Sequence, residues 1–344
     1  MKLGLMLGYS GKKISINIDD MKKAESLGYD SVWTAEAYGS DAVTAASWIL
    51  AQTEKLKVGT CIMQMPARSP AMAAMTAMTL DQLSNGRFIV GLGASGPQVV
   101  EGWHGVPYGK PITRTKEYIR IMKSIFAREE HLEFDGDVYQ LPNKGPGTTG
   151  LGKPLKSIIQ VDGDIPIYTA SITPNGLAAA GEVADGVFPL IMSPERPEAG
   201  LDHVQKGLDK SGRTLANFDI APTVPCVMDD NEQGCRDLVK PFLALYIGGM
   251  GAKGKNFYTS YVTRMGFGDA AEKIQDLYLA GKKEEATAAV PDQLVDEIAL
   301  VGSEERIRER AVRWKQAAEK NHVGTLLLNV QQPELLPILA EALL

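Results

Sequence analysis

Short apolar runs alternate with amphipathic stretches along the whole chain, and this alternation predicts repeated strand and helix units. The runs are rich in Val, Ile and Leu and are bounded by Gly, Asn, Asp or Pro, as expected for buried parallel strands. We expect strands at residues 3–8, 31–36, 56–63, 88–92, 165–170, 186–191, 220–228 and 324–330. Helices are expected at residues 16–27, 42–52, 69–83, 114–127, 175–183, 195–211, 232–248, 304–320 and 334–344.

Eight strand and helix units without a short internal repeat favour a (β/α)8 barrel over an open doubly wound sheet. Residues 132–141, LEFDGDVYQL, contain an Asp-Gly turn and predict a hairpin inserted after the fourth unit. Residues 249–302 are Gly-rich at first and helical later, and predict a lid or extra helices after strand seven. Since no linker divides the chain, residues 1–344 are expected to form a single barrel domain.

Composition narrows the possible partners. The formal net charge is −6 and the Lys and Arg residues are scattered among acids, which argues against a nucleic-acid surface. The four His and three Cys residues are too widely spaced for a zinc or iron-sulfur motif, so no metal is expected. No apolar run is long enough for a membrane span or a signal peptide. We therefore expect a cytoplasmic protein that acts on a small molecule.

In a barrel of this kind, functional residues lie where strands end and helices begin. Residues 170–173, Ala-Ser-Ile-Thr, join a predicted strand to a helix and resemble an anion site, because helix N-termini present unpaired N–H groups. Plain N-capping by Thr173 is the alternative. Residues 91–96, GLGASG, favour a floor of small residues for a planar or phosphorylated ligand, because the acidic residue of a dinucleotide fingerprint is missing.

Glycines and titratable residues mark the same strand ends. Gly59, Gly91 and Gly93 suggest a backbone or a ligand close to the sheet, with crowding inside the barrel as the alternative. Glu36 closes strand two and is expected to face the barrel mouth, unless it is an exposed or capping acid. His104 lies on a long loop and is a candidate proton donor or substrate ligand, with loop packing as the alternative.

Two blocks of sequence, PARSPAMAAMTAMTLDQLSNGRFIVGLGASG and IPIYTASITPNGLAAAGEVADGVF, resemble the luciferase-like flavin and deazaflavin barrel superfamily, and especially its coenzyme F420 branch. That branch includes methylenetetrahydromethanopterin reductase and the F420-dependent glucose-6-phosphate dehydrogenase. The resemblance runs nearly end to end, and it implies a barrel that holds the ring system in its mouth. It is not specific for a substrate.

The resemblance also implies roles for individual residues. The ring is expected to rest against a bulge in strand three with a non-prolyl cis peptide bond, here Cys61-Ile62. Glu36 matches an acidic residue that contacts the deazaflavin, and Gln64 matches a polar contact to the ring. Further cofactor contacts are expected at Ala94 and Ser95 and, on the phosphate side, at Ala170, Ser171, Ile172 and Thr173.

Two departures separate the chain from the sugar-phosphate dehydrogenase. Ala37 and Gly96 stand where that enzyme has a catalytic His and Glu, so oxidation of a sugar phosphate is not expected. The leading hypothesis is an F420-dependent oxidoreductase that moves a hydride between the deazaflavin C5 and an apolar ketone, alcohol or activated alkene. The alternatives are a luciferase-like monooxygenase that uses FMN and oxygen, and a non-catalytic flavin-binding protein. The mouth is expected to be lined by Tyr9, Met63, Trp103, Tyr108 and Met192.

The predicted helix at residues 71–83 is unusually apolar for the outside of a barrel. Met72, Met75 and Met78 recur on it at helical spacing. Burial by a second copy of the chain would remove this surface from water, so we expect a homodimer.

Overall fold

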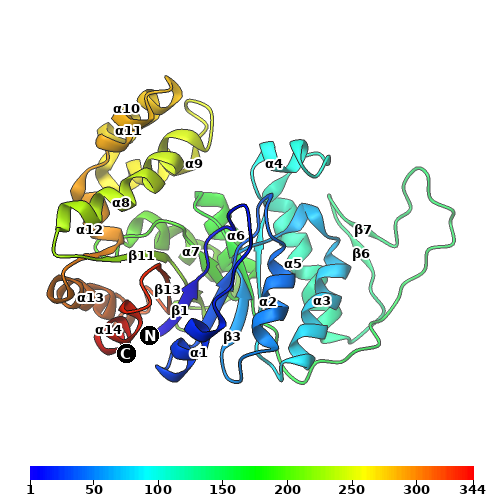
Figure 1. The fold of residues 1–344 in the computed structure, drawn as a ribbon. Coiled ribbons are helices and arrows are strands. Elements are labelled where there is room, and N and C mark those ends of the chain that lie inside the picture. The colour runs from blue at the N-terminus through cyan, green and yellow to red at the C-terminus, as the bar shows by residue number, and fades with distance from the viewer.

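Eight strand positions form a closed parallel barrel in the computed structural model, which describes all 344 residues (Figure 1). Neighbours in the ring pair in parallel, and the last strand pairs with the first. Two of the eight positions are interrupted and count as two short strands each. In chain order the strands are β1 (Lys2–Met6), β2 (Ser31–Thr34), β3 (Lys57–Thr60) with β4 (Met63–Gln64), β5 (Phe88–Gly93), β8 (Ile167–Ala170), β9 (Gly186–Phe188), β10 (Asp219–Ile220) with β11 (Thr223–Met228), and β13 (Thr325–Val330).

The ring closes at the interrupted seventh strand. β10 pairs with β9 on one side, whereas β11 pairs with β13 on the other. Between them, the Ala221 N–H donates to the Val187 carbonyl and the Leu327 N–H donates to the Pro222 carbonyl, each at 2.9 Å. Because proline has no N–H, the interruption leaves no ladder donor unpaired at Pro222. The predicted (β/α)8 barrel is confirmed.

Helices cover the outside of the barrel and bury their apolar faces against the strands in a cluster of 52 core residues. Several begin at a side chain that accepts a hydrogen bond from the first turn, among them Asn17, Asp41, Ser69 and Ser303. None of the helices is long and apolar enough to cross a membrane. The outer helices are α1 (Ile18–Ser26), α2 (Ala42–Leu50), α3 (Pro70–Leu83), α5 (Pro111–Ala127), α6 (Pro174–Val183), α7 (Glu198–Ser211), α13 (Glu304–Glu319) and α14 (Leu335–Leu343).

A helical insertion, residues 229–302, follows strand seven and rises above the barrel (Figure 1). It starts earlier than the predicted residue 249, because the first helix packs into a second cluster of 20 buried residues, most of which belong to the insertion. Its last strand pairs with β11 and was not predicted. The insertion consists of α8 (Glu232–Ala244), the π-helical segment η3 (Leu245–Gly249), α9 (Phe257–Val262), the segment η4 (Thr263–Phe267), which is kinked at Gly266, α10 (Gly268–Leu279), α11 (Lys283–Ala288), α12 (Asp292–Ile298) and β12 (Leu300–Gly302).

Two smaller additions complete the fold. The predicted hairpin is present as β6 (Phe134–Asp135) and β7 (Gln140–Leu141), and the chain beyond it forms an arm that projects from the body (Figure 1). A short helix that the sequence did not predict, α4 (Pro97–Gly102), lies in the loop after β5. The remaining short 3-10 turns are Met65–Ala67 and Leu215–Asn217.

Aromatic side chains fill the middle of the barrel. Trp33, Tyr168 and Phe188 pack together with ring centroids 5.1 to 5.6 Å apart. The Trp33 indole N–H donates to Ser31 Oγ at 2.9 Å, so its polar atom is satisfied although the side chain is buried. This cluster makes the barrel a packed core and confines any ligand to the ends of the strands.

Candidate functional site

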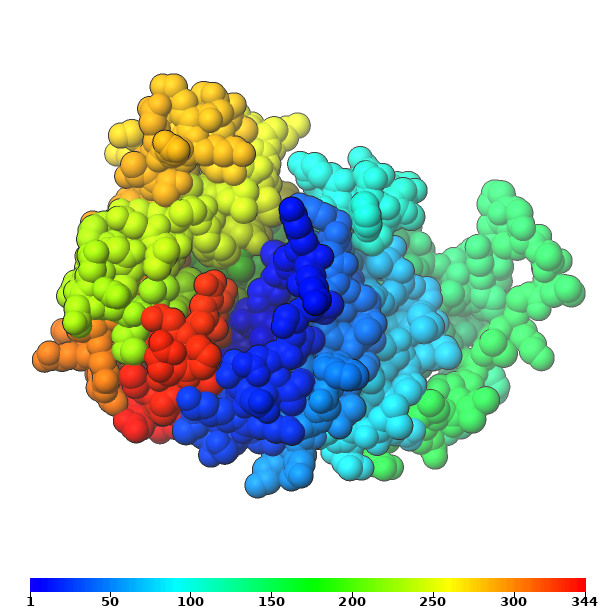
Figure 2. All heavy atoms as spheres, in the orientation of Figure 1, coloured from blue at the N-terminus to red at the C-terminus, as the bar shows by residue number.

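The carboxyl ends of the strands open between two raised parts of the molecule. In Figure 2 the helical insertion (yellow to orange) and the α4 loop (cyan) rise on either side of the loop that follows β1 (dark blue). Loops after β1, β2, β4, β5 and β8 end at this face, and they carry Glu36, His104 and residues 170–173. The site is therefore the barrel mouth, where parallel barrels place their functional groups.

A bulge in strand three lies at the rim of this mouth. The registers of β3 and β4 against β5 leave three residues of strand three opposite two of β5. The Cys61-Ile62 peptide bond within it is cis, so this prediction is confirmed. Thr60 Oγ1 donates to the Gly91 carbonyl at 2.8 Å and accepts from the Gly91 N–H at 3.0 Å, which replaces the interrupted ladder bonds. Cys61 and Ile62 are half-buried and pack against the inner aromatic cluster.

The three glycines near the bulge make room for the protein itself. A Cβ on Gly91 would lie 1.7 Å from the Thr60 carbonyl oxygen, so a backbone passes close to it, as predicted. A Cβ on Gly59 would lie 2.3 Å from the Trp33 ring, and one on Gly93 would lie 2.6 Å from the Ile62 side chain. Crowding inside the barrel, the alternative explanation, accounts for these two.

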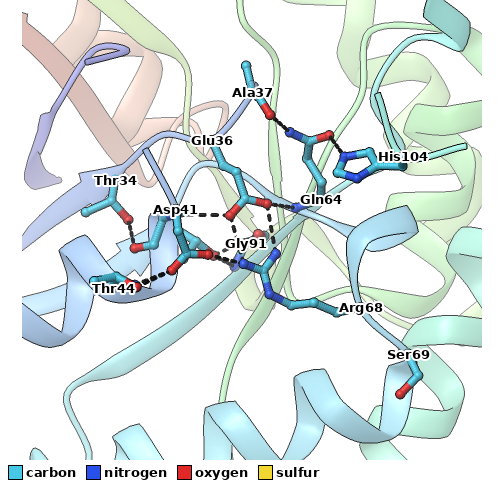
Figure 3. Close-up of polar contacts among 12 residues, drawn as sticks. Thr34, Glu36, Ala37, Asp41, Thr44, Gln64, Arg68, Ser69, Gly91 and His104 are labelled. Atoms are coloured by element: carbon cyan, nitrogen blue, oxygen red, sulfur yellow. Dashed lines mark hydrogen bonds and ion pairs between the residues drawn. The ribbon is translucent and has the colours of Figure 1, made fainter. Parts of the chain in front are cut away.

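Glu36 is part of a polar network within the rim (Figure 3). Its side chain is 8 % exposed and accepts two hydrogen bonds from Arg68, at 2.8 and 2.9 Å. The same carboxylate accepts the N–H of Ala42 at 3.1 Å and the N–H of Gln64 at 3.0 Å. Arg68 also pairs with Asp41, the N-cap of α2. The carboxylate expected to face the mouth thus has four donors from its own chain, and it ties the bulge to β2 and α2.

Gln64 joins this network to His104. The Gln64 Nε2 donates to the Ala37 carbonyl, and the Gln64 Oε1 lies 2.9 Å from His104 Nε2 (Figure 3). Gln64 is almost fully buried, whereas His104 is half-buried on the loop after α4. Two residues that are 40 positions apart in the chain are therefore in direct contact at the mouth. The alternative of a histidine that only packs its loop does not account for this contact.

The loop from Ala170 to Thr173 ends at the N-terminus of α6. Thr173 Oγ1 accepts the Gly176 N–H at 3.1 Å, so the capping alternative is realised. The backbone N–H groups of Ile172 and Thr173 nevertheless have no acceptor in the protein. Two unpaired amides at the positive end of a helix are suited to an anionic oxygen. Capping and anion binding are thus compatible at this loop.

A second pair of free amides lies after β5. The N–H groups of Ala94 and Ser95 have no acceptor in the protein, and both residues are half-buried. Ser95 has a left-handed backbone with φ of 59°, which few residues other than glycine adopt. This conformation turns the chain sharply between β5 and α4 at the rim of the mouth.

The insertion adds functional candidates that sequence reasoning missed. Tyr246 of η3 lies near Tyr9, which follows β1. Burial raises the pKa of the Tyr246 phenol, so it is a neutral hydroxyl near neutral pH. Arg264 of η4 donates to the Ile172 carbonyl at 2.9 Å and so supports the loop before α6. The π-helical turn η3 belongs to a class that is rare and often found at functional sites, and η4 is kinked at Gly266, yet no pattern in the sequence marked these two segments.

The prediction that Met63 and Met192 line the mouth is wrong. Met63 and Met192 are buried in the main core that lies between the strands and the outer helices. Tyr9 and Trp103 are exposed at the mouth, and Tyr108 is half-buried beside Glu101. Burial raises the pKa of the Cys61 thiol to about 12, so Cys61 is protonated and not a nucleophile at neutral pH.

Comparison with known proteins identifies the family. Residues 2–319 match the family model described as luciferase-like monooxygenase. The chain belongs to this family. It is 42 % identical over 321 residues, 92 % of each chain, to a Mycobacterium tuberculosis protein provisionally named coenzyme F420-dependent oxidoreductase. It is also 29 % identical over 229 residues, 66 % of each chain, to 5,10-methylenetetrahydromethanopterin reductase of Methanolobus tindarius. The predicted resemblance is confirmed, and the protein is an oxidoreductase of this family.

Solved structures share the fold across the whole chain. The F420-dependent tetrahydromethanopterin reductase of Methanopyrus kandleri aligns with a TM-score of 0.78 at 20 % identity and covers 99 % of this chain and 97 % of its own. An F420-dependent secondary alcohol dehydrogenase aligns with a TM-score of 0.75 at 16 % identity, over 100 % and 99 % of the two chains. An FMN-bound Baeyer-Villiger monooxygenase from Pseudomonas putida aligns with a TM-score of 0.67 at 19 % identity, over 99 % and 97 %.

Proposed function

We propose that the protein is a coenzyme F420-dependent oxidoreductase that moves a hydride between the deazaflavin C5 and an apolar ketone, alcohol or activated alkene. The observation that carries the proposal is the arrangement of the bulge at Cys61-Ile62 beside two sets of unpaired backbone amides at one barrel mouth. A flat ring with a phosphorylated side chain has the shape and charge for that arrangement. The relative at 42 % identity carries an F420-dependent name, which supports this cofactor over others.

The residues at the mouth fit such a cofactor. Cys61 and Ile62 would support the ring from below, and Ala94 and Ser95 would contact it from the loop after β5. The loop Ala170–Thr173 would hold the phosphate, because the free N–H groups of Ile172 and Thr173 supply donors there. When bound, the cofactor supplies the carbon that gives or takes the hydride. Glu36 would act indirectly, by holding the Gln64 backbone in place.

The side chains near the mouth support the proposed substrate class. Tyr9, Tyr38 and Trp103 are exposed there, and the ring centroids of Tyr38 and Trp103 are 6.4 Å apart. These aromatic surfaces favour an apolar substrate over a sugar phosphate. Ala37 lacks a side chain for proton transfer. His104 lies nearby, because Gln64 contacts both the Ala37 carbonyl and the His104 ring. His104 is therefore the proposed proton donor or acceptor.

A titration tests the cofactor. Purified protein is mixed with F420, FMN and NADPH separately, and the visible absorbance and melting temperature are measured for each ligand. We expect the F420 spectrum to change and the melting temperature to rise with F420 more than with FMN, since a ligand that binds only the native state stabilises it. No change with F420 at any concentration would overturn the proposal.

The FMN-dependent monooxygenase is the second candidate, and the family description and the FMN-bound structural neighbour favour it. It predicts tighter binding of FMN and oxygen uptake with a reduced flavin. A non-catalytic flavin-binding protein would bind a cofactor but give no turnover with a panel of ketones, alcohols and alkenes. The same titration followed by oxygen-electrode measurements separates the three.

We also propose that the protein is a homodimer that buries α3. Met72 and Met75 on α3 are each more than half exposed, whereas Met78, about one turn further along the helix, is buried in the core. A stripe of exposed Met side chains favours contact with a second copy. Sedimentation velocity at micromolar concentration should show a dimer, and Met72→Glu with Met75→Glu should convert it to a monomer. A wild-type monomer under these conditions would refute the dimer.

A further inference from the structure

Gln64 is fixed at three points, which determines the direction of its side-chain amide. Its backbone N–H is held by Glu36 at 3.0 Å, and its side chain lies between the Ala37 carbonyl and the His104 ring (Figure 3). A carbonyl oxygen can only accept a hydrogen bond, so the amide nitrogen must face Ala37. The amide oxygen must then face His104. The reversed amide would place two oxygens against each other at Ala37.

The direction of the amide determines the proton on His104. Because the Gln64 Oε1 is an acceptor, the His104 Nε2 at 2.9 Å must carry a hydrogen. The His104 Nδ1 has no partner in the protein, and it does not belong to the buried unpaired polar atoms. It is therefore the ring nitrogen that is free to meet solvent or a substrate.

We propose that Gln64 is a positioning residue that holds His104 as its Nε2–H tautomer, so that Nδ1 is the nitrogen that exchanges a proton with the substrate. The catalytic meaning of this inference depends on the proposed oxidoreductase function. The tautomer itself does not depend on it, because every contact involved belongs to the protein alone.

The fixed tautomer suits proton transfer in both directions. Reduction of a carbonyl requires a hydride at carbon and a proton at oxygen, and the doubly protonated ring can give its Nδ1 proton to that oxygen and return to the neutral Nε2–H form. Oxidation of an alcohol reverses this, since the neutral ring accepts the hydroxyl proton at Nδ1. In the opposite tautomer Nδ1 would carry the hydrogen of the neutral ring and could not accept a proton.

The experiment is NMR of the cofactor-free protein labelled with 15N only at histidine. The chain has four His residues, so the variant His104→Gln assigns the His104 signals by their disappearance. Long-range proton-nitrogen correlation spectra identify the protonated nitrogen of the neutral ring. We expect Nε2–H in the wild type, and its proton should exchange with water slowly enough to be observed. A neutral His104 with its hydrogen on Nδ1 would overturn the proposal.

Three variants separate positioning by Gln64 from a general effect of the loop. Gln64→Leu removes the acceptor and should increase the Nε2–H exchange rate at least tenfold. Gln64→Asn keeps a side-chain amide with a donor and an acceptor, and should keep the exchange slower than in Gln64→Leu. Gln98→Leu, an exposed position on the helix that precedes His104, serves as the matched control and should leave the rate unchanged. An unchanged rate in Gln64→Leu would also overturn the proposal.

The outcome is distinguishable from failure of the proposed function. Absorbance titration with F420 tests the cofactor without using His104, and the NMR measurement tests His104 without a cofactor. A protein that shows the Nε2–H tautomer but ignores F420 would retain the positioning role and lose the F420 assignment. A protein that binds F420 but shows Nδ1–H would retain the F420 assignment and lose the positioning role of Gln64.

Discussion

The two sides of the barrel mouth are built in different ways. The rim around the bulge is held by hydrogen bonds that start from the strands themselves, such as those of Thr60 with Gly91 and of Glu36 with Gln64. The helical insertion supplies most of a second hydrophobic cluster, and it is fixed to the barrel where Ile172, Ile191 and Ala199 join that cluster and by ion pairs at its base, including Arg196 with Glu297. The rim is therefore as rigid as the barrel, whereas the insertion can loosen independently of it.

The largest effect is expected from Gly91→Ala in the rim. The added Cβ would overlap the Thr60 carbonyl oxygen, which is backbone and cannot move without opening the bulge. We expect the free energy of unfolding to fall by about 3 kcal/mol or more, the upper end of overpacking effects. Chemical denaturation measures it. Gly102→Ala is the matched control, because its Cβ would meet open space, and an equal loss there would contradict the explanation.

Arg68→Met tests the ion pair of the rim. It leaves the Glu36 carboxylate nearly buried without its cation, which should lower the free energy of unfolding by about 2–3 kcal/mol. The comparison is Arg308→Met, which removes an exposed pair with Glu304 and Glu341 and should cause no measurable change. Similar losses for the two variants in chemical denaturation would show that burial does not decide the outcome.

Arg196→Met tests the base of the insertion. Glu297 is 3 % exposed and would keep only the hydrogen bond from Gln293. We expect a loss of about 2 kcal/mol that is concentrated in the insertion. Hydrogen exchange should accelerate in α9 and α12 and remain unchanged in β5. Uniform acceleration through both parts would refute the independence of the insertion.

The smallest effect concerns pH and Asp41 in the rim. Burial alone raises the pKa of this carboxyl, but hydrogen bonds from Thr44 and the charge of Arg68 outweigh it and hold the pKa below its usual 3.8. A carboxyl whose pKa is lowered by folding stabilises the fold at pH values above the pKa of the unfolded chain. This stabilisation is lost as the pH falls through the pKa of the folded chain. Asp41→Asn keeps a good N-cap, so it should reduce stability by only about 0.5 kcal/mol at pH 7. It should also flatten the acid limb of the unfolding curve below about pH 4, and an unaltered limb would argue against this role.

The difference between the barrel with its rim and the helical insertion also decides how much of the molecule the sequence could predict. The alternation of apolar runs was sufficient for the barrel, and family resemblance located the cis bond at Cys61-Ile62. Met63 was misplaced because the extra residue of the bulge reverses which face the following residues occupy, and strict alternation does not reveal this. Tyr246 and Arg264 were missed because the π-helical turn η3 and the kink at Gly266 in η4 depart from the helical period used to assign faces. The contact of Gln64 with His104 depends on the path of a long loop, which no local pattern specifies.

The return of the insertion to the barrel has a consequence for how such enzymes diversify. Its final strand, β12, pairs with β11, and the Asp229 N–H donates to the Gly302 carbonyl at 3.1 Å. The chain thus leaves the barrel and returns to it at neighbouring points beside β11. The intervening helices can be replaced by helices of a different shape while the barrel stays closed. New substrates then become accessible without a change in the barrel itself.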